Sequence, residues 1–208
     1  MPGYMAIIKC MDEHKLSEIQ EFFDNKILGF MMNDLEQSVV AKTNFLTALG
    51  CLTYTETIGA FLPSIRGERG SKEARRFYRC LFRFSSNEYL ILLDNEIRRE
   101  TTRQTGLYEH LRHSASHMYQ PTIKKRNPDG TFSFVHVTIA KFARNQSNGP
   151  SPPMGIKDNG DFVIATQNYV RELKEAANIF RKKICTDRDP DWVNSGIKGI
   201  DYLARSLK

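Results

Sequence analysis

The sequence has few of the features that mark membrane, secreted or metal-binding proteins. Its cysteines are widely separated, at Cys10, Cys51, Cys80 and Cys185. They form no CxxC or Cys/His spacing, so they indicate neither a zinc knuckle nor a redox pair. Residues 1–9 lack the apolar core of a signal peptide, and the most apolar later stretch, 44–62, is interrupted by polar residues. We therefore expect reduced thiols, a cytoplasmic location and no membrane partner.

Internal repeats and low-complexity runs are also absent from the sequence. The chain has 208 residues, of which 40% are hydrophobic and 11% aromatic, and this is enough to build the core of one domain. The charged fraction of 26% is ordinary for a globular protein. This composition excludes a chain that is disordered throughout.

Positive charge is concentrated in a few segments. The formal net charge is +6, and residues 63–83 carry seven cations against two anions, a net charge of +5. This balance is compatible with a polyanionic partner but does not require one, since each cluster could equally be a solvated face. The candidate RNA-binding residues are Arg75, Arg76, Lys124, Lys125 and Arg126. Aromatic residues interleave with the first cluster, among them Phe77, and they either stack bases or belong to the core.

Apolar residues recur every three or four positions over much of the chain, which predicts helices. The expected helices cover 12–32, 34–61, 71–84, 88–99, 106–119 and 160–184. We expect a break at Asn33-Asp34 and an end at Pro63, so that the first two helices pair as an antiparallel hairpin. The expected buried stripe of the second helix is Leu35, Val39, Leu46, Leu49, Thr53 and Ile58.

A β-hairpin is expected after Pro121. Asp129-Gly130 occupies its turn, and the second arm, 131–140, is rich in β-branched and aromatic residues. The predicted fold class is all-α, an up-and-down helical bundle in one domain, 1–185, with this hairpin as an insertion at about 121–142. Residues 186–208 form a polar tail that either docks as a short helix or stays mobile.

Three of the five histidines lie within 107–121. On a helix, at ~100° per residue, His110, His113 and His117 fall along one face, with Arg112 roughly 140° from His117. One interpretation is that these side chains line a packing surface. A second is that the three imidazoles bind zinc, although ligands seven residues apart are about 10 Å apart along a helix and converge poorly on one ion.

A third interpretation of the same stretch is nucleolytic. An imidazole with a pKa near ~6.5 can take a proton from a ribose 2′-hydroxyl or give one to a leaving oxygen. A guanidinium beside it can hold the phosphate and the charge that develops on it. This chemistry needs neither a metal nor a cofactor.

The segment Arg112-His113-Ser114-Ala115-Ser116-His117 resembles the signature of the HEPN superfamily (higher eukaryotes and prokaryotes nucleotide-binding domain). That signature is an arginine, a polar residue, three further residues and a histidine, in the next-to-last helix of an α-bundle. The resemblance covers about 12–120 and the last helix, 160–184. It implies a helical bundle that usually dimerises, and in many members a metal-independent ribonuclease of toxin–antitoxin or defence systems.

The resemblance implies roles for three residues. Arg112 would bind the scissile phosphate, His117 would act as acid or base, and His113 would orient them. Glu56 is an acid on an otherwise apolar helix face, and it either pairs with Arg112 or a histidine or lies exposed among threonines.

We therefore expect a metal-independent RNA endonuclease, without cofactors, that acts as a homodimer. RNA and a cognate antitoxin or operon partner are the expected partners. The alternative is a non-catalytic HEPN-like module that binds nucleotides or another protein.

Overall fold

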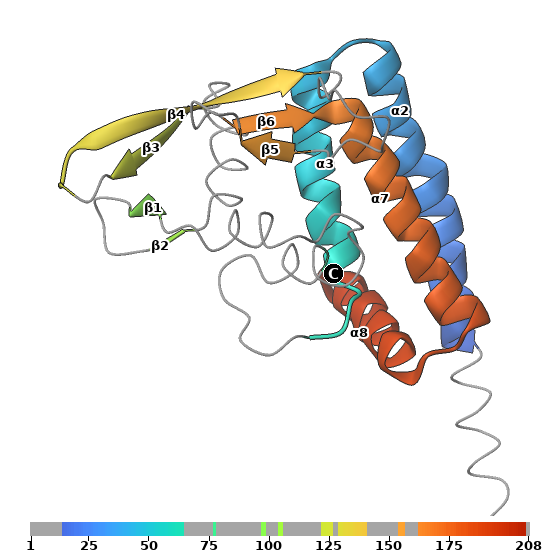
Figure 1. Ribbon diagram of the computed structural model, residues 1–208. Helices are drawn as coiled ribbons and strands as arrows, with labels where there is room; N and C mark the ends of the chain where they lie inside the picture. Colours follow the sequence, from blue (N-terminus) through green and yellow to red (C-terminus); the bar gives the residue numbers. More distant parts are fainter. Residues whose placement is uncertain are drawn as a thin grey trace, which may run out of the picture.

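The computed structural model describes residues 14–64, 77, 97–98, 104–105, 122–126, 129–140, 154–156 and 162–206. They form a bundle of long helices with a small sheet beside the end where α3 and α7 begin (Figure 1). The predicted mostly helical fold with a β-hairpin is therefore confirmed.

The first helical hairpin turns later than the sequence suggested. Residues 14–22 are α-helical, and the helix continues through the π-helical η1 (Phe23–Met31) into α2 (Met32–Val40). The predicted break at Asn33-Asp34 is therefore wrong. Both residues lie inside a helix, because the apolar spacing on either side of them stays in phase and Met32 and Leu35 are both buried.

The turn between α2 and α3 is instead made by residues 41–43. Lys42 adopts a left-handed conformation with φ of 60°. Its N–H donates to the carbonyl of Val39 at 3.2 Å, and the N–H of Thr43 donates to the carbonyl of Ser38 at 3.1 Å. This pair of bonds is the Schellman pattern, which satisfies the last carbonyls of a helix and stops it.

Helix α3 (Asn44–Gly59) has a different buried face from the predicted one. Leu46 is 55% exposed and Thr53 is exposed, whereas Thr47 and Thr55 are fully buried. The prediction assumed one helix through 34–61, and the turn at 41–43 resets the helical phase. Leu35, Val39 and Ile58 of the predicted stripe are buried; Leu49 is half-buried.

The predicted helix over 160–184 is correct except at its start. Residues Phe162–Ala165 form strand β6, and α7 (Thr166–Arg181) follows directly and continues as the π-helical η2 (Lys182–Thr186). Helix α7 is amphipathic and packs against α2, α3 and η1. It is thus the central helix of the described bundle.

The C-terminal segment contains a long docked helix, α8 (Pro190–Ser206). Asp189 caps it by accepting the N–H of Asp191 at 3.1 Å, and proline occupies the first helical position. Two glycines allow the close approach of α8 to the bundle. A Cβ at Gly199 would lie 2.5 Å from the ring of Phe61, and one at Gly196 would lie 2.8 Å from Ile184.

Four strands form one sheet in the order β3-β4-β6-β5. Strands β3 (Thr122–Arg126) and β4 (Phe132–Ala140) pair antiparallel, β4 pairs parallel with β6, and β5 (Met154–Ile156) pairs antiparallel with β6. The predicted hairpin is therefore present, and β4 also joins it to the strand that leads into α7. The β3 end of the sheet extends away from the helices (Figure 1).

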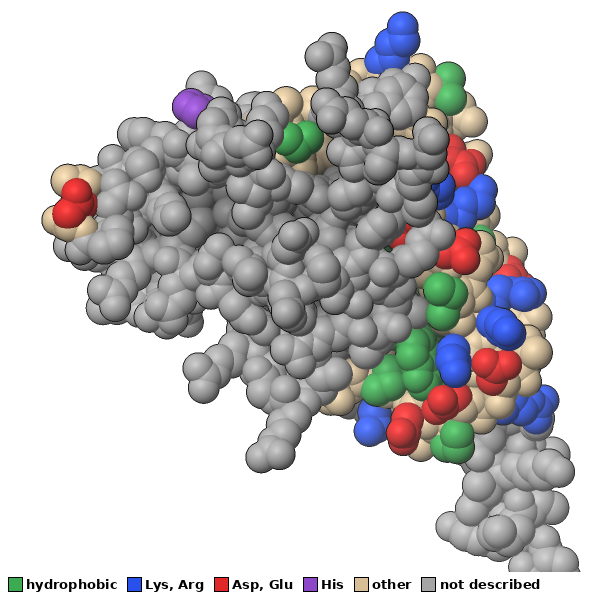
Figure 2. Space-filling model, in the orientation of Figure 1, with side chains coloured by type: hydrophobic (Ala, Val, Ile, Leu, Met, Phe, Trp, Pro, Cys, Tyr) green, Lys and Arg blue, Asp and Glu red, His purple; other side chains and the backbone are tan. Residues whose placement is uncertain are grey.

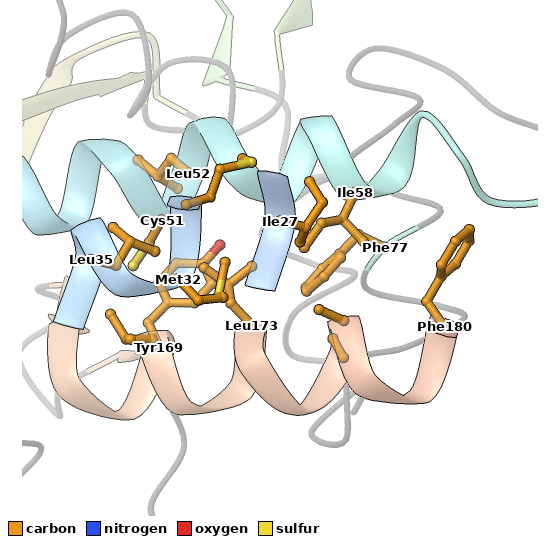
Figure 3. Close-up of a cluster of buried hydrophobic side chains, with 14 of the residues drawn as sticks. Ile27, Met32, Leu35, Cys51, Leu52, Ile58, Phe77, Tyr169, Leu173 and Phe180 are labelled. Atoms are coloured by element: carbon orange, nitrogen blue, oxygen red, sulfur yellow. The ribbon is translucent and has the colours of Figure 1, made fainter. Parts of the chain in front are cut away.

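Two other predicted helices are only partly described. Ile97–Arg98 forms strand β1, paired with β2 (Gln104–Thr105), so the predicted helix over 88–99 is wrong at its end. Phe77, in the predicted helix over 71–84, is helical and fully buried, and it belongs to the core (Figure 3). Burial decides between the two roles left open for this ring, and it rules out base stacking.

The core lies between α3 and α7, with η1 and α2 packed across both (Figure 3). Its largest fully buried side chains include Tyr169, Phe23, Phe61 and Phe180. On the exterior, α7 is tied to α2 by Lys174 and Glu36 at 2.6 Å, and to η1 by Arg181 and Asp24 at 2.5 Å. Basic and acidic side chains alternate over the coloured helices in Figure 2, so no field of one sign covers that part of the visible face.

Candidate functional site

The structure tests the predicted site residues unevenly. Arg112, His113 and His117, together with His110, lie outside the described residues, as do Arg75 and Arg76. Lys124, Lys125 and Arg126 form most of strand β3. The backbone pairing of the hairpin that carries these three cations is therefore the part of the predicted site that the structure describes.

Asp129 and Gly130 lie in a turn directly before strand β4. Gly130 has a φ of 86°, which L-residues rarely adopt. Asp129 Oδ1 accepts the backbone N–H of Thr131 at 2.9 Å and its hydroxyl at 2.7 Å, and these two bonds lower the pKa of the Asp129 carboxyl. The sequence signal, an Asp-Gly pair ahead of an arm rich in β-branched and aromatic residues, located this turn correctly.

The register of the hairpin separates the three cations. Lys124 pairs with Phe134, Lys125 with Ser133 and Arg126 with Phe132. Successive residues of a strand lie on opposite faces of the sheet. Lys124 and Arg126 therefore share one face, and Lys125 belongs to the other.

A second polar feature is the buried seam between α3 and α7. The hydroxyl of Thr55 donates to the carbonyl of Cys51 at 2.8 Å and lies 2.8 Å from the hydroxyl of Tyr169. Nearer the sheet, the hydroxyl of Thr166 is 3.5 Å from Oδ1 of Asn44. The apolar spacing indicated only apolar packing between these helices. The hydrogen bonds of these hydroxyl groups also join α3 to α7.

The most deeply buried acid of the described helices is Glu172 on α7, which is 2% exposed. Glu56 on α3, the acid that the sequence singled out, is half-buried. At ~100° per residue Glu172 lies roughly 60° from Tyr169 and roughly 40° from Ala176, on the buried side of the helix, so its place was readable from the apolar spacing. Both acids make interactions within the protein.

Metal ligands do not cluster in the described part of the chain. No group of three or more His, Cys, Asp or Glu side chains there could hold a metal ion. Cys51 and Cys185 are free thiols, and burial raises the pKa of both. Cys51 therefore stays protonated inside the bundle at neutral pH.

A hollow of about 400 Å³ lies between the end of α3 and the start of α8. Its floor is the chain after α3, including Leu62 and Pro63. Its wall is a polar stripe on one face of α8: Asp191, Asn194, Ser195 and Lys198. It is separated in sequence from all the predicted site residues.

Comparison with known proteins identifies no family for this chain, so the resemblance to HEPN proteins rests on the sequence signature. No protein-family model, curated protein or solved structure matches the chain. Among the described helices, none is both long enough and apolar enough to cross a membrane.

Proposed function

We propose that this protein is a metal-independent ribonuclease of HEPN type that works as a cytoplasmic homodimer. The observation that carries the proposal is the spacing of Arg112, His113 and His117 in the sequence. The order of the elements around this segment supports it. The helical hairpin of α2 and α3 precedes the segment and the long helix α7 follows it, as the HEPN resemblance implies, while α8 is a further helix after α7 that the resemblance does not include.

The proposed reaction transfers a phosphodiester within the RNA. The imidazole of His117 accepts the proton of a ribose 2′-hydroxyl, and the 2′-oxygen attacks the adjacent phosphorus. Arg112 binds the phosphate and stabilises its extra negative charge, while His113 orients the pair. The bond from phosphorus to the 5′-oxygen breaks, and that oxygen takes up a proton. The products are a 2′,3′-cyclic phosphate and a free 5′-hydroxyl.

A dimer gives this mechanism its second proton-transfer group. One His117 can act as the base while its twin on the second copy protonates the leaving oxygen. A cognate antitoxin or operon partner would then act by covering this shared cleft. The cations of β3 support the same proposal, because they add positive charge for a polyanionic substrate.

The test is incubation of the purified protein with total RNA in excess EDTA. We expect wild type to cleave and an Arg112→Ala/His117→Ala variant to be slower by at least about 100-fold, the usual effect of losing a general acid or base. His110→Ala is the matched control, because it removes an imidazole of the same segment outside the signature. The cleaved ends should carry a cyclic phosphate.

The same assay decides against the proposal if the folded wild-type dimer leaves RNA intact, or if the double variant cleaves as fast as wild type. In the first case the protein is a non-catalytic module that binds a nucleotide or a partner. Activity that disappears in EDTA and returns with zinc would instead favour the three histidines as metal ligands.

A further inference from the structure

The hollow between α8 and the chain that leaves α3 has a volume of about 400 Å³, which is in the range of small-molecule sites. Figure 1 shows α8 lying against the end of α3. The two sides are packed together directly beside the hollow, because a Cβ on Gly199 would lie 2.5 Å from the buried ring of Phe61. Ala60 and Leu62, on either side of Phe61, and Lys198, which precedes Gly199, all line the hollow. Its shape is therefore part of the packed fold and does not have to form when a ligand binds.

One wall of the hollow is a polar stripe on α8. Four side chains, spaced at i, i+3, i+4 and i+7, lie along one face of the helix: Asp191, Asn194, Ser195 and Lys198. No hydrogen bond or ion pair joins these four side chains to another group in the described part of the chain. The exterior of α7 differs, because its Lys174 and Arg181 are paired with acids of the neighbouring helix. The polar groups of the stripe therefore keep their full capacity to bind a ligand.

The two charges of the stripe are at its ends. Asp191 and Lys198 are seven residues apart, which is ~10 Å along a helix. The amide of Asn194 and the hydroxyl of Ser195 lie between them, and Leu62 supplies apolar surface on the other side of the hollow. The described lining thus has an anion at one end, a cation at the other and no net charge.

This arrangement matches a ligand with an ammonium group at one end, a carboxylate at the other and hydrogen-bonding groups between. A free peptide of two or three residues is such a zwitterion at neutral pH, and it spans ~7–10 Å at ~3.5 Å per residue. A nucleotide or free phosphate matches poorly, because its negative charges would meet one cation and the carboxylate of Asp191. The C-terminal end of α3, at Ala60, adds partial negative charge beside the hollow.

We propose that the hollow between α3 and α8 binds a short zwitterionic peptide, with its ammonium group at Asp191 and its carboxylate at Lys198. Asn194 and Ser195 bond the peptide groups between these ends. A ligand that touches both sides of the hollow binds the folded state and holds α8 on the bundle. The inference does not depend on the ribonuclease proposal, since the described lining includes no residue of the Arg112–His117 segment or of β3.

The test is isothermal titration calorimetry of the full chain with triglycine. We expect a dissociation constant of about 1 mM, the order usual for a ligand of this size. Acetyl-triglycine lacks the ammonium group and triglycinamide lacks the carboxylate. Each should bind wild type about fivefold more weakly than triglycine, the effect of one lost ion pair at a partly exposed site. Uridine 5′-monophosphate should not displace triglycine.

Two variants assign each charged group of the ligand to one residue. Asp191→Asn should bind triglycine about fivefold more weakly and should no longer distinguish it from acetyl-triglycine. Lys198→Gln should lose the distinction between triglycine and triglycinamide. Glu175→Gln and Lys182→Gln are the matched controls, because they remove exposed charges of α7 and η2 that do not line the hollow. Both should bind all three peptides like wild type.

Four results would overturn the inference. They are no binding by folded wild type at about 10 mM triglycine, capped peptides that bind as tightly as triglycine, variants that keep the wild-type preference for free ends, and displacement of triglycine by the nucleotide. A circular dichroism melt of each variant shows that it is folded. If Asp191→Asn disturbs the start of α8, the Lys198→Gln comparison decides, because Lys198 lies two turns farther along the helix.

Discussion

Two regions of the bundle are held together by different interactions. At the end where α8 docks, which we call the aromatic end, the contacts are between rings: Phe22, Phe23, Phe61, Phe180 and Trp192. Phe23 and Phe180 stack with ring centroids 4.3 Å apart, and Phe61 meets Phe23 edge-on at 5.3 Å. The seam between α3 and α7 instead buries hydroxyl groups, with Thr55 and Tyr169 hydrogen-bonded at 2.8 Å.

The two kinds of contact contribute differently: buried rings stabilise the fold, and buried hydrogen bonds align one helix with another. Each buried ring removes a large apolar area from water, and that term is not directional. A buried hydrogen bond contributes a smaller net free energy, but it is lost when one helix slides or rotates against the other. We infer that the aromatic end contributes more to the free energy of unfolding than the Thr55–Tyr169 hydrogen bond does, and that this bond sets the register of α3 and α7.

The largest predicted effect is at the aromatic end. Phe23→Ala removes a fully buried ring that touches Phe22, Phe61 and Phe180, so it should lower the free energy of unfolding by about 3–5 kcal/mol. Phe30→Ala is the control, because Phe30 is in the same helix η1 and is 64% exposed. Urea denaturation should show a change within about 0.5 kcal/mol for the control. Similar losses in both variants would contradict the aromatic end as the stabilising cluster.

The next effect concerns Cys51, one helical turn before Thr55 in the seam. Burial raises the pKa of its thiol, so the folded state holds this proton above the pH at which the unfolded chain releases it. Stability is then fully present below about pH 8.5 and falls as the pH rises further, by up to about 1.4 kcal/mol per pH unit. Cys51→Ala lacks this dependence.

Unfolding free energies measured between pH 7.5 and pH 10 test this prediction. The free energy of unfolding of wild type minus that of Cys51→Ala should fall by about 2 kcal/mol over that range. The pKa of Tyr54 is raised by burial, by Asp34 and also by Cys51, so both proteins are compared in a Tyr54→Phe background. A constant gap would mean that the thiol ionises as easily in the folded chain as in the unfolded one.

A smaller effect tests the seam itself. Thr55→Val and Tyr169→Phe each remove one hydroxyl of the buried pair. The double variant should show a coupling free energy of about 1 kcal/mol, the usual net value of a buried hydrogen bond. Thr53→Val with Tyr169→Phe is the matched cycle, because Thr53 is exposed and its hydroxyl donates to the carbonyl of Leu49 within α3. That control should show no coupling free energy. A coupling as large as that of Thr55 with Tyr169 would contradict a specific hydrogen bond between those two side chains.

The sequence predicted these two regions unequally, for a physical reason. Apolar spacing reports one buried side of a helix, so it found the helices that carry the buried Phe23, Leu173 and Phe180. It cannot report which threonine is buried, because a threonine fits both a core and a surface. Thr53 was therefore assigned to the core in place of Thr55. Strand β6 was taken as part of α7 because its pairing partner, β4, lies more than twenty residues away in sequence.

In the candidate site, too, the sequence predicted one part and the other part needed the structure. The hairpin was predictable because its signals are local: an Asp-Gly turn and a second arm rich in β-branched and aromatic residues. The grouping of its cations and rings needs the register, which fixes Lys124 opposite Phe134 and assigns Lys125 to the other face. The roles of Arg112, His113 and His117 stay predictions, since these residues lie outside the described part of the chain.

The smallest effect is expected at the turn that the sequence did not predict. Lys42 is left-handed, with φ of 60°, a conformation that costs an L-residue about 1 kcal/mol and glycine almost nothing. Glycine also has more conformational entropy in the unfolded chain, which offsets part of this relief. Lys42→Gly should therefore stabilise the protein by at most about 0.5–1 kcal/mol. Lys42→Ala is the control, because it removes the charge and keeps the strain. If urea denaturation showed Lys42→Gly to be no more stable than Lys42→Ala, the left-handed conformation at this position would not lower the stability of the protein. A gain confined to glycine would show that α2 stops because Lys42 is held left-handed, a property that periodicity alone does not encode.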